Sequence, residues 1–76
     1  MASDKPASMT DDQRWAIAAG LYDLGIVAGQ ILSRARRAAL LEDAVPGWRY
    51  GSDLNPLSEH QAGDVLELIE RRRRGE

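Results

Sequence analysis

The chain has 76 residues, of which 43% are hydrophobic, and it carries a formal net charge of −2 and no cysteine. So short a chain forms one domain at most, with a small core. The lack of cysteine excludes disulfide bonds and thiolate metal sites, and it fits the reducing cytoplasm, where we expect the protein. The negative charge argues against a dedicated nucleic-acid binder, whose domain is typically basic.

The sequence predicts a flexible tail over 1–9 and a single helical domain over 10–76. Residues 1–9 are mostly small or polar and include Pro6, a composition typical of mobile chain ends, and they do not resemble a secretory signal. The segment TDDQ that starts at Thr10 has the form of a capping box, with a hydroxyl at the cap and a glutamine three residues later. We therefore expect the first helix to begin after Thr10.

The first helix is apolar around most of its circumference. At about 100° per residue, one side gathers Trp15, Ala18, Ala19, Tyr22 and Ile26, and the adjoining arc gathers Ile17, Leu21 and Leu24. An arc this wide indicates burial on more than one side, and one short partner helix could hardly cover it. We therefore expect a homo-oligomer or a tight complex with another protein, in which Trp15, Tyr22 and Ile26 make the contact.

Gly25 predicts a break after this helix, because glycine can adopt the left-handed C-cap conformation and is followed here by the apolar Ile26. The alternative is one continuous helix from Thr10 to Asp43. In that helix Gly20, Gly25 and Gly29 would each cost about 1 kcal/mol relative to alanine, which favours the break. The apolar run 15–32 has the length of a short membrane span, but Asp23 and Gln30 interrupt it, so we expect no membrane insertion.

The second helix is expected over about 28–43. Its inner face is predicted to carry Ile31, Leu32, Ala35, Ala38 and Ala39. Pro46 ends it, because a proline disfavours the helical conformation in the preceding residue.

SEHQ, starting at Ser58, again has capping-box form and opens a third helix, whose apolar stripe is Ala62, Val65, Leu66, Leu68 and Ile69. No strand-like alternation appears. The fold class is therefore predicted to be all-α: a helical hairpin with a third helix docked on it, in an oligomer.

Two of the four aromatic residues lie in the loop PGWRYG, residues 46–51. One interpretation is a plug, in which Trp48 and Tyr50 close the seam between the helices and each ring buries on the order of 150–250 Å². The other is an exposed contact with a partner, because Trp, Tyr and Arg are the residues most frequent at interface hot spots. In that case Trp48, Arg49 and Tyr50 form a second contact; base stacking is the third and weakest interpretation.

A DNA-binding regulator is the alternative function. The segment LYDLGIVAGQILSRARR, residues 21–37, has the glycine turn and arginine-rich second helix of a helix-turn-helix, and arginines suit base edges and phosphates. The nucleic-acid contacts would be Arg34, Arg36, Arg37, Arg71, Arg72, Arg73 and Arg74. However, Arg34 and Arg36 lie about 160° apart on the helix, and the second interpretation of the C-terminal run is a cationic helix end that complements the helix dipole.

His60, Asp64 and Glu67 have metal-compatible spacing on one helix side, but one histidine with two carboxylates on a surface helix is a common arrangement. We predict no metal, no cofactor and no small-molecule substrate. The sequence contains no nucleophile–base constellation and no phosphate-cradling glycine loop, so we do not expect an enzyme.

The segment ARRAALLEDAVPGWRYG, residues 35–51, resembles the helicase-associated helical repeats of actinobacterial proteins. The similarity depends on Leu41, Glu42, Pro46, Gly47 and Trp48, and it extends through PLSEHQAGDVLELIE to residue 70. The resemblance implies short helices and an association with nucleic acid. From the residues themselves, we predict a non-catalytic interaction module, a regulator or accessory subunit that acts by binding protein.

Overall fold

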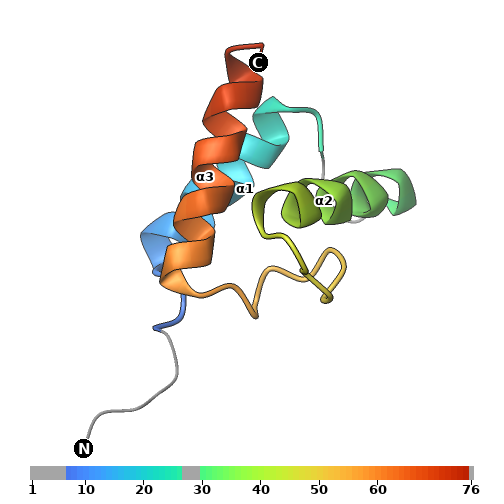
Figure 1. The fold of residues 1–76 in the computed structure, drawn as a ribbon. Coiled ribbons are helices and arrows are strands. Elements are labelled where there is room, and N and C mark those ends of the chain that lie inside the picture. Colours follow the sequence, from blue (N-terminus) through green and yellow to red (C-terminus); the bar gives the residue numbers. More distant parts are fainter. Residues whose placement is uncertain (1–6, 27–29, 76) are drawn as a thin grey trace, which may run out of the picture.

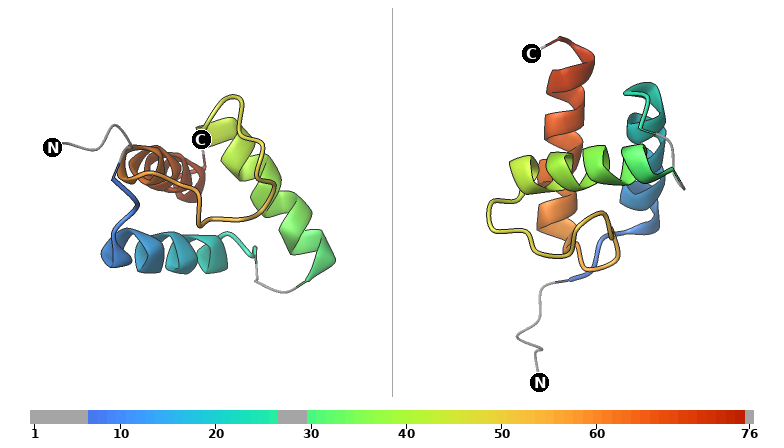
Figure 2. Two further views of the ribbon diagram at one scale, coloured as in Figure 1. Left: turned by 90° about the horizontal axis from the view of Figure 1, so that it is seen from below. Right: turned by 90° about the vertical axis from the view of Figure 1, so that its right-hand side faces the viewer.

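The computed structural model describes residues 7–26 and 30–75, which form three α-helices: α1 (Asp11–Asp23), α2 (Ile31–Ala44) and α3 (Glu59–Arg73). The predicted all-α class is confirmed. The closest packing is not between the first two helices, as a hairpin would require. Instead, α3 packs mainly against α1 and also contacts α2, whereas α1 and α2 barely touch. Figure 1 and Figure 2 show α2 lying across the pair formed by α1 and α3.

Both predicted capping boxes are present. The Thr10 hydroxyl accepts the Gln13 backbone N–H at 3.0 Å, and the Thr10 N–H donates to the Gln13 side chain at 3.0 Å. Ser58 and Gln61 make the same two bonds at the start of α3, at 3.1 and 3.0 Å. Two of the N–H groups that each helix start leaves without an intrahelical partner are thus satisfied locally. These bonds fix where α1 and α3 begin.

The break at Gly25 is confirmed. Gly25 has φ of +77°, and its N–H donates to the Tyr22 carbonyl at 2.9 Å, while the Ile26 N–H donates to the Leu21 carbonyl at 2.8 Å. These two bonds form a Schellman motif, which requires the left-handed conformation that glycine adopts without strain. The predicted start of the second helix at 28 lies outside the described residues. Gln30 has an extended backbone and occupies the N-cap position without a side-chain cap hydrogen bond, and α2 begins at Ile31.

Within the tail predicted over 1–9, residues 7–9 pack on the domain. Residues 1–6 lie outside the described part of the chain. Ser8 pairs with Ser58 in an antiparallel bridge, and the backbone of Ala7 accepts the Glu59 N–H at 2.7 Å. Met9 belongs to the core. Because these contacts join segments about fifty residues apart, no local pattern in 1–9 reveals them.

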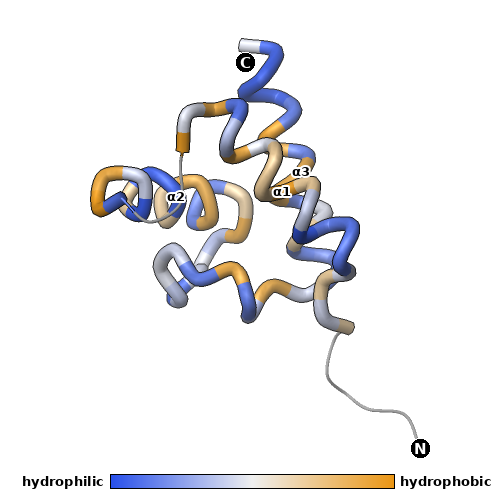
Figure 3. Tube along the Cα trace, turned by 180° about the vertical axis from the view of Figure 1, so that it is seen from behind, coloured by the Kyte–Doolittle hydropathy of each residue, from blue (hydrophilic) through white to orange (hydrophobic). Residues whose placement is uncertain are grey.

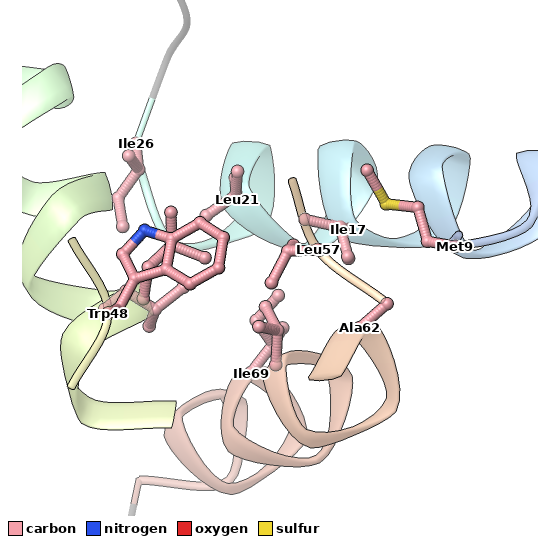
Figure 4. Packing of buried hydrophobic residues seen from close by; sticks show 11 residues of the cluster. Met9, Ile17, Leu21, Ile26, Trp48, Leu57, Ala62 and Ile69 are labelled. Carbon is pink, nitrogen blue, oxygen red and sulfur yellow. The ribbon is translucent and has the colours of Figure 1, made fainter. Parts of the chain in front are cut away.

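The core lies between the three helices and is closed by the loop that follows α2 (Figure 4). Its largest fully buried side chains are Ile17, Leu40, Leu41, Leu57, Val65 and Ile69. α1 lies close against α3 at Gly20, where a Cβ would lie 2.6 Å from the Ile69 Cγ2. Gly20 therefore permits the close helix crossing that positions α1.

The predicted inner face of α2 is wrong. Ile31 is 81% exposed and Leu32 is 70% exposed, and Ala35 and Ala39 are exposed too. The buried residues of α2 are instead Ser33, Leu40 and Leu41. Leu40 lies about 180° around the helix from Ile31, so burying it turns Ile31 towards solvent. Figure 3 shows the resulting hydrophobic colour at the outer end of α2.

Candidate protein-interaction surface

The exposed side of α1 carries a continuous apolar ridge, formed by Trp15, Ala18, Ala19 and Tyr22 and here named the α1 ridge. Trp15 is 75% exposed and Tyr22 is 74% exposed, and both alanines are exposed. Trp15 and Tyr22 lie seven positions apart, so their side chains project on the same side about two turns apart. The opposite side of α1 buries Ile17, Gly20 and Leu21. The wide apolar arc of the sequence is thus divided between the core and solvent.

Ile26 does not belong to this exposed surface, contrary to the sequence prediction. It is buried, because the Schellman turn folds it back beside Leu21 and into the core cluster. A helix extended through Gly25 would have kept Ile26 in line with Trp15 and Tyr22. The prediction of a shared face therefore assumed a helical geometry that the chain leaves at Leu24.

Trp48 is a structural plug. It is 8% exposed and belongs to the core, and its indole Nε1 donates to the Gly51 carbonyl at 3.0 Å. The rings of Trp48 and Tyr50 pack edge to face, with 5.0 Å between their centroids. Figure 4 places the indole beside Ile26 and Leu21. Trp48 therefore has little surface to offer a partner, whereas Arg49 and Tyr50 are exposed.

Two arginines, Arg14 on α1 and Arg37 on α2, donate hydrogen bonds to this loop. The Arg37 Nε donates to the Ser52 carbonyl at 3.0 Å, and the Arg14 Nη1 donates to the Asn55 Oδ1 at 3.0 Å. These bonds connect α2 and α1 with the segment that leads to α3. Arg37, predicted as a nucleic-acid contact, thus has a structural partner within the chain.

The C-terminal arginines also make contacts within the fold. Arg73 pairs with Asp23 of α1 at 3.0 Å and with Glu70 at 2.9 Å, and Arg72 pairs with Asp43 of α2. Arg71 makes the predicted four-residue pair with Glu67 at 2.8 Å. Asp23 and Asp43 stand at or next to the ends of α1 and α2. The arginine run therefore ties the end of α3 to the ends of both other helices, which the sequence did not predict.

The residues of metal-compatible spacing, His60, Asp64 and Glu67, lie on α3. His60 and Asp64 are 3.7 Å apart on an exposed side of α3. Within residues 7–26 and 30–75, no three histidine or acidic side chains are placed to hold a metal ion.

Among these same residues, no helix has the length and apolar character needed to cross a membrane. Arg34 and Arg36, predicted as nucleic-acid contacts, are exposed on α2.

No family model, curated protein or solved structure matches this chain. The resemblance of residues 35–70 to helicase-associated repeats therefore stays a prediction. That segment runs from α2 through the Trp48 loop into α3. It does not include the α1 ridge.

Proposed function

We propose that the protein is a non-catalytic helical interaction module that binds another protein chain through the α1 ridge. The observation that supports this function is the exposure of Trp15 and Tyr22, 75% and 74%, on one side of one helix. Monomeric soluble proteins rarely expose large contiguous apolar patches, and such patches mark interaction sites. Trp and Tyr are also the residues that most often dominate the free energy of association.

The ridge is held rigidly before any partner arrives. The capping box of Thr10 fixes one end of α1 and the Schellman motif at Gly25 fixes the other. Between them Ile17 and Leu21 anchor the inner side of the helix in the core. A preorganised surface loses less conformational entropy on association. Arg49 and Tyr50, exposed on the loop, are the proposed second contact.

Site-specific photo-crosslinking tests this function. A photoreactive phenylalanine analogue replaces Trp15 or Tyr22, and irradiation of the producing cells should link the chain to a second polypeptide. The matched control places the analogue at Glu67, which is exposed on α3 and lies outside the ridge. Adducts from both ridge positions and few from position 67 support the proposal. Equal labelling at all three positions, or none at the ridge, would refute it.

A DNA-binding regulator is the second candidate, favoured by the exposed Arg34 and Arg36 on α2. The ion pairs of Arg72 with Asp43 and of Arg73 with Asp23 count against it, because each carboxylate partly neutralises the positive charge that would attract a phosphate. A duplex shift assay at low salt separates the two functions. DNA binding through phosphates weakens steeply as salt rises, and no shift at low salt removes this candidate.

A further inference from the structure

α2 presents a second exposed apolar strip, formed by Ile31, Leu32, Ala35 and Ala39 and here named the α2 strip. All four side chains are exposed, Ile31 and Leu32 to 81% and 70%. Like the α1 ridge, the strip combines two large apolar side chains with two alanines. Small side chains allow helix axes to approach towards the lower end of the usual range of about 8–10 Å. Both surfaces therefore allow a partner helix to approach closely.

The charges beside the two surfaces are opposite. Asp11 and Asp12 are exposed in the first turn of α1, within about 60° of Trp15 around the helix. Around Ile31, Leu32 and Ala35, α2 carries Arg34, Arg36 and Arg37, and its acidic residues, Glu42 and Asp43, come only after Ala39 near the end of the helix. Arg34 and Arg36 are exposed beside the α2 strip. Two α1 ridges facing each other would bring like charges together, whereas an α1 ridge facing an α2 strip brings aspartates towards arginines.

The apolar area of the α1 ridge also indicates that a stable dimer needs a second contact surface. The two aromatics of the α1 ridge bury on the order of 150–250 Å² each, which falls short of the roughly 800 Å² per partner of a standard interface. Covering Ile31 and Leu32 in the same contact supplies apolar area that the ridge lacks. A two-fold symmetric pair does this without further partners, because each copy contributes one ridge and one strip.

We propose that the partner of the α1 ridge is the α2 strip of a second copy of this chain. The two copies exchange the contact reciprocally, so that each ridge lies on the strip of the other copy. Asp11 and Asp12 of one copy face Arg34 and Arg36 of the other. This inference rests on the proposed function and names its partner.

Light scattering over a range of concentrations gives the first test. The wild type should show a mass twice that of the 8.4 kDa chain, falling towards the monomer on dilution. Trp15→Ala and Leu32→Gln should each raise the dimer dissociation constant about thirtyfold or more, as loss of a hot-spot side chain does. His60→Ala, on an exposed part of α3, is the control and should leave it unchanged. A wild type that stays monomeric at every concentration overturns the proposal.

Charge reversal tests the pairing itself. The double variants Asp11→Arg/Asp12→Arg and Arg34→Glu/Arg36→Glu should each be largely monomeric, since ridge and strip then carry like charges. Mixed together, the two variants should form a heterodimer, because both of its contacts again join opposite charges. Circular dichroism before mixing establishes that each variant is helical. A less disruptive pair, Asp12→Asn and Arg34→Gln, serves if a double variant fails to fold, and each should weaken the dimer by a smaller factor.

The outcomes separate this inference from the proposed function. If Trp15→Ala dissociates the dimer while reversal at Arg34 and Arg36 has no effect, the ridge binds a second copy but not its α2 strip, and the pairing is wrong. If the chain is monomeric and crosslinks from position 15 to a different protein, the partner is not a second copy of this chain. The proposed function as an interaction module is then still supported. A monomer without adducts from the ridge removes both.

Discussion

Gly20 of α1 lies directly against Ile69 of α3, so closely that a Cβ at position 20 would come within 2.6 Å of the Ile69 Cγ2. Ile69 is a branched side chain enclosed by the core, and it has little room to move away. Gly20→Ala should therefore separate α1 from α3 and lower the free energy of unfolding by up to about 2 kcal/mol. This net value sets overpacking of about 1–3 kcal/mol against the roughly 1 kcal/mol that alanine gains over glycine in a helix. Urea denaturation measures it.

Gly63→Ala is the matched control, because Gly63 also lies within a helix but a Cβ there meets nothing within 4 Å. With space available, only the helix propensity and the loss of unfolded-chain freedom change, and both favour alanine. We expect the free energy of unfolding to rise by about 0.5–1 kcal/mol. If both alanine variants stabilise the protein, the helix crossing at Gly20 is looser than described.

Replacing the plug should weaken the fold without touching the α1 ridge. Trp48→Phe removes the hydrogen bond from the indole Nε1 to the Gly51 carbonyl, for which a loss of about 0.5–1.5 kcal/mol is typical, together with part of the ring packing. Thermal unfolding followed by circular dichroism should show a lower melting temperature. Tyr50→Phe keeps the ring that meets Trp48 and should change the melting temperature little. A Trp48→Phe variant with the melting temperature of the wild type would contradict the structural role of this side chain.

The features that the sequence predicted correctly are those decided by neighbouring residues. Thr10 bonds to Gln13, three positions away, and Gly25 and Ile26 bond to carbonyls three and five positions earlier in the chain. Such bonds follow from local stereochemistry. The side of α2 that faces the core is decided by distant contacts. Both Leu40 and Ile31 are apolar, and only the position of α3 and of the Trp48 loop selects Leu40 for burial. That choice exposes Ile31 and Leu32, and for this reason the α2 strip could not be predicted.

Trp15 and Tyr22 illustrate the other limit of sequence reasoning. Their apolar character indicated burial, and the width of the arc indicated that one molecule could not bury all of it. Which part of the arc stays exposed depends on the crossing at Gly20, which turns Ile17 and Leu21 towards α3. Ile26 was assigned to the exposed part because a helical angle was applied beyond the point where α1 ends.

Met9 should contribute to stability although it precedes the first helix. It is buried in the core, and its N–H donates to the Leu57 carbonyl at 3.3 Å. Met9→Ala should therefore lower the free energy of unfolding by about 2 kcal/mol or more, the usual cost of truncating a buried methionine. Met9→Leu conserves the volume and should cost less than about 1.5 kcal/mol. Equal stability of wild type and Met9→Ala would show that this segment does not pack on the core.

The ion pair between Arg73 and Asp23 joins the ends of α3 and α1 at 3.0 Å. Both side chains are about half exposed, so water screens the pair and its contribution should be small, on the order of 0.2–1 kcal/mol. A double-mutant cycle of Arg73→Gln and Asp23→Asn, measured by urea denaturation, gives this coupling free energy. Arg73 also pairs with Glu70 at 2.9 Å, and the cycle removes that contribution because it is lost equally with and without Asp23. We expect the coupling to decrease as sodium chloride is raised to 1 M, where the screening length falls to about 3 Å. A coupling near zero at low salt would mean that the helix ends are held together by the apolar core alone.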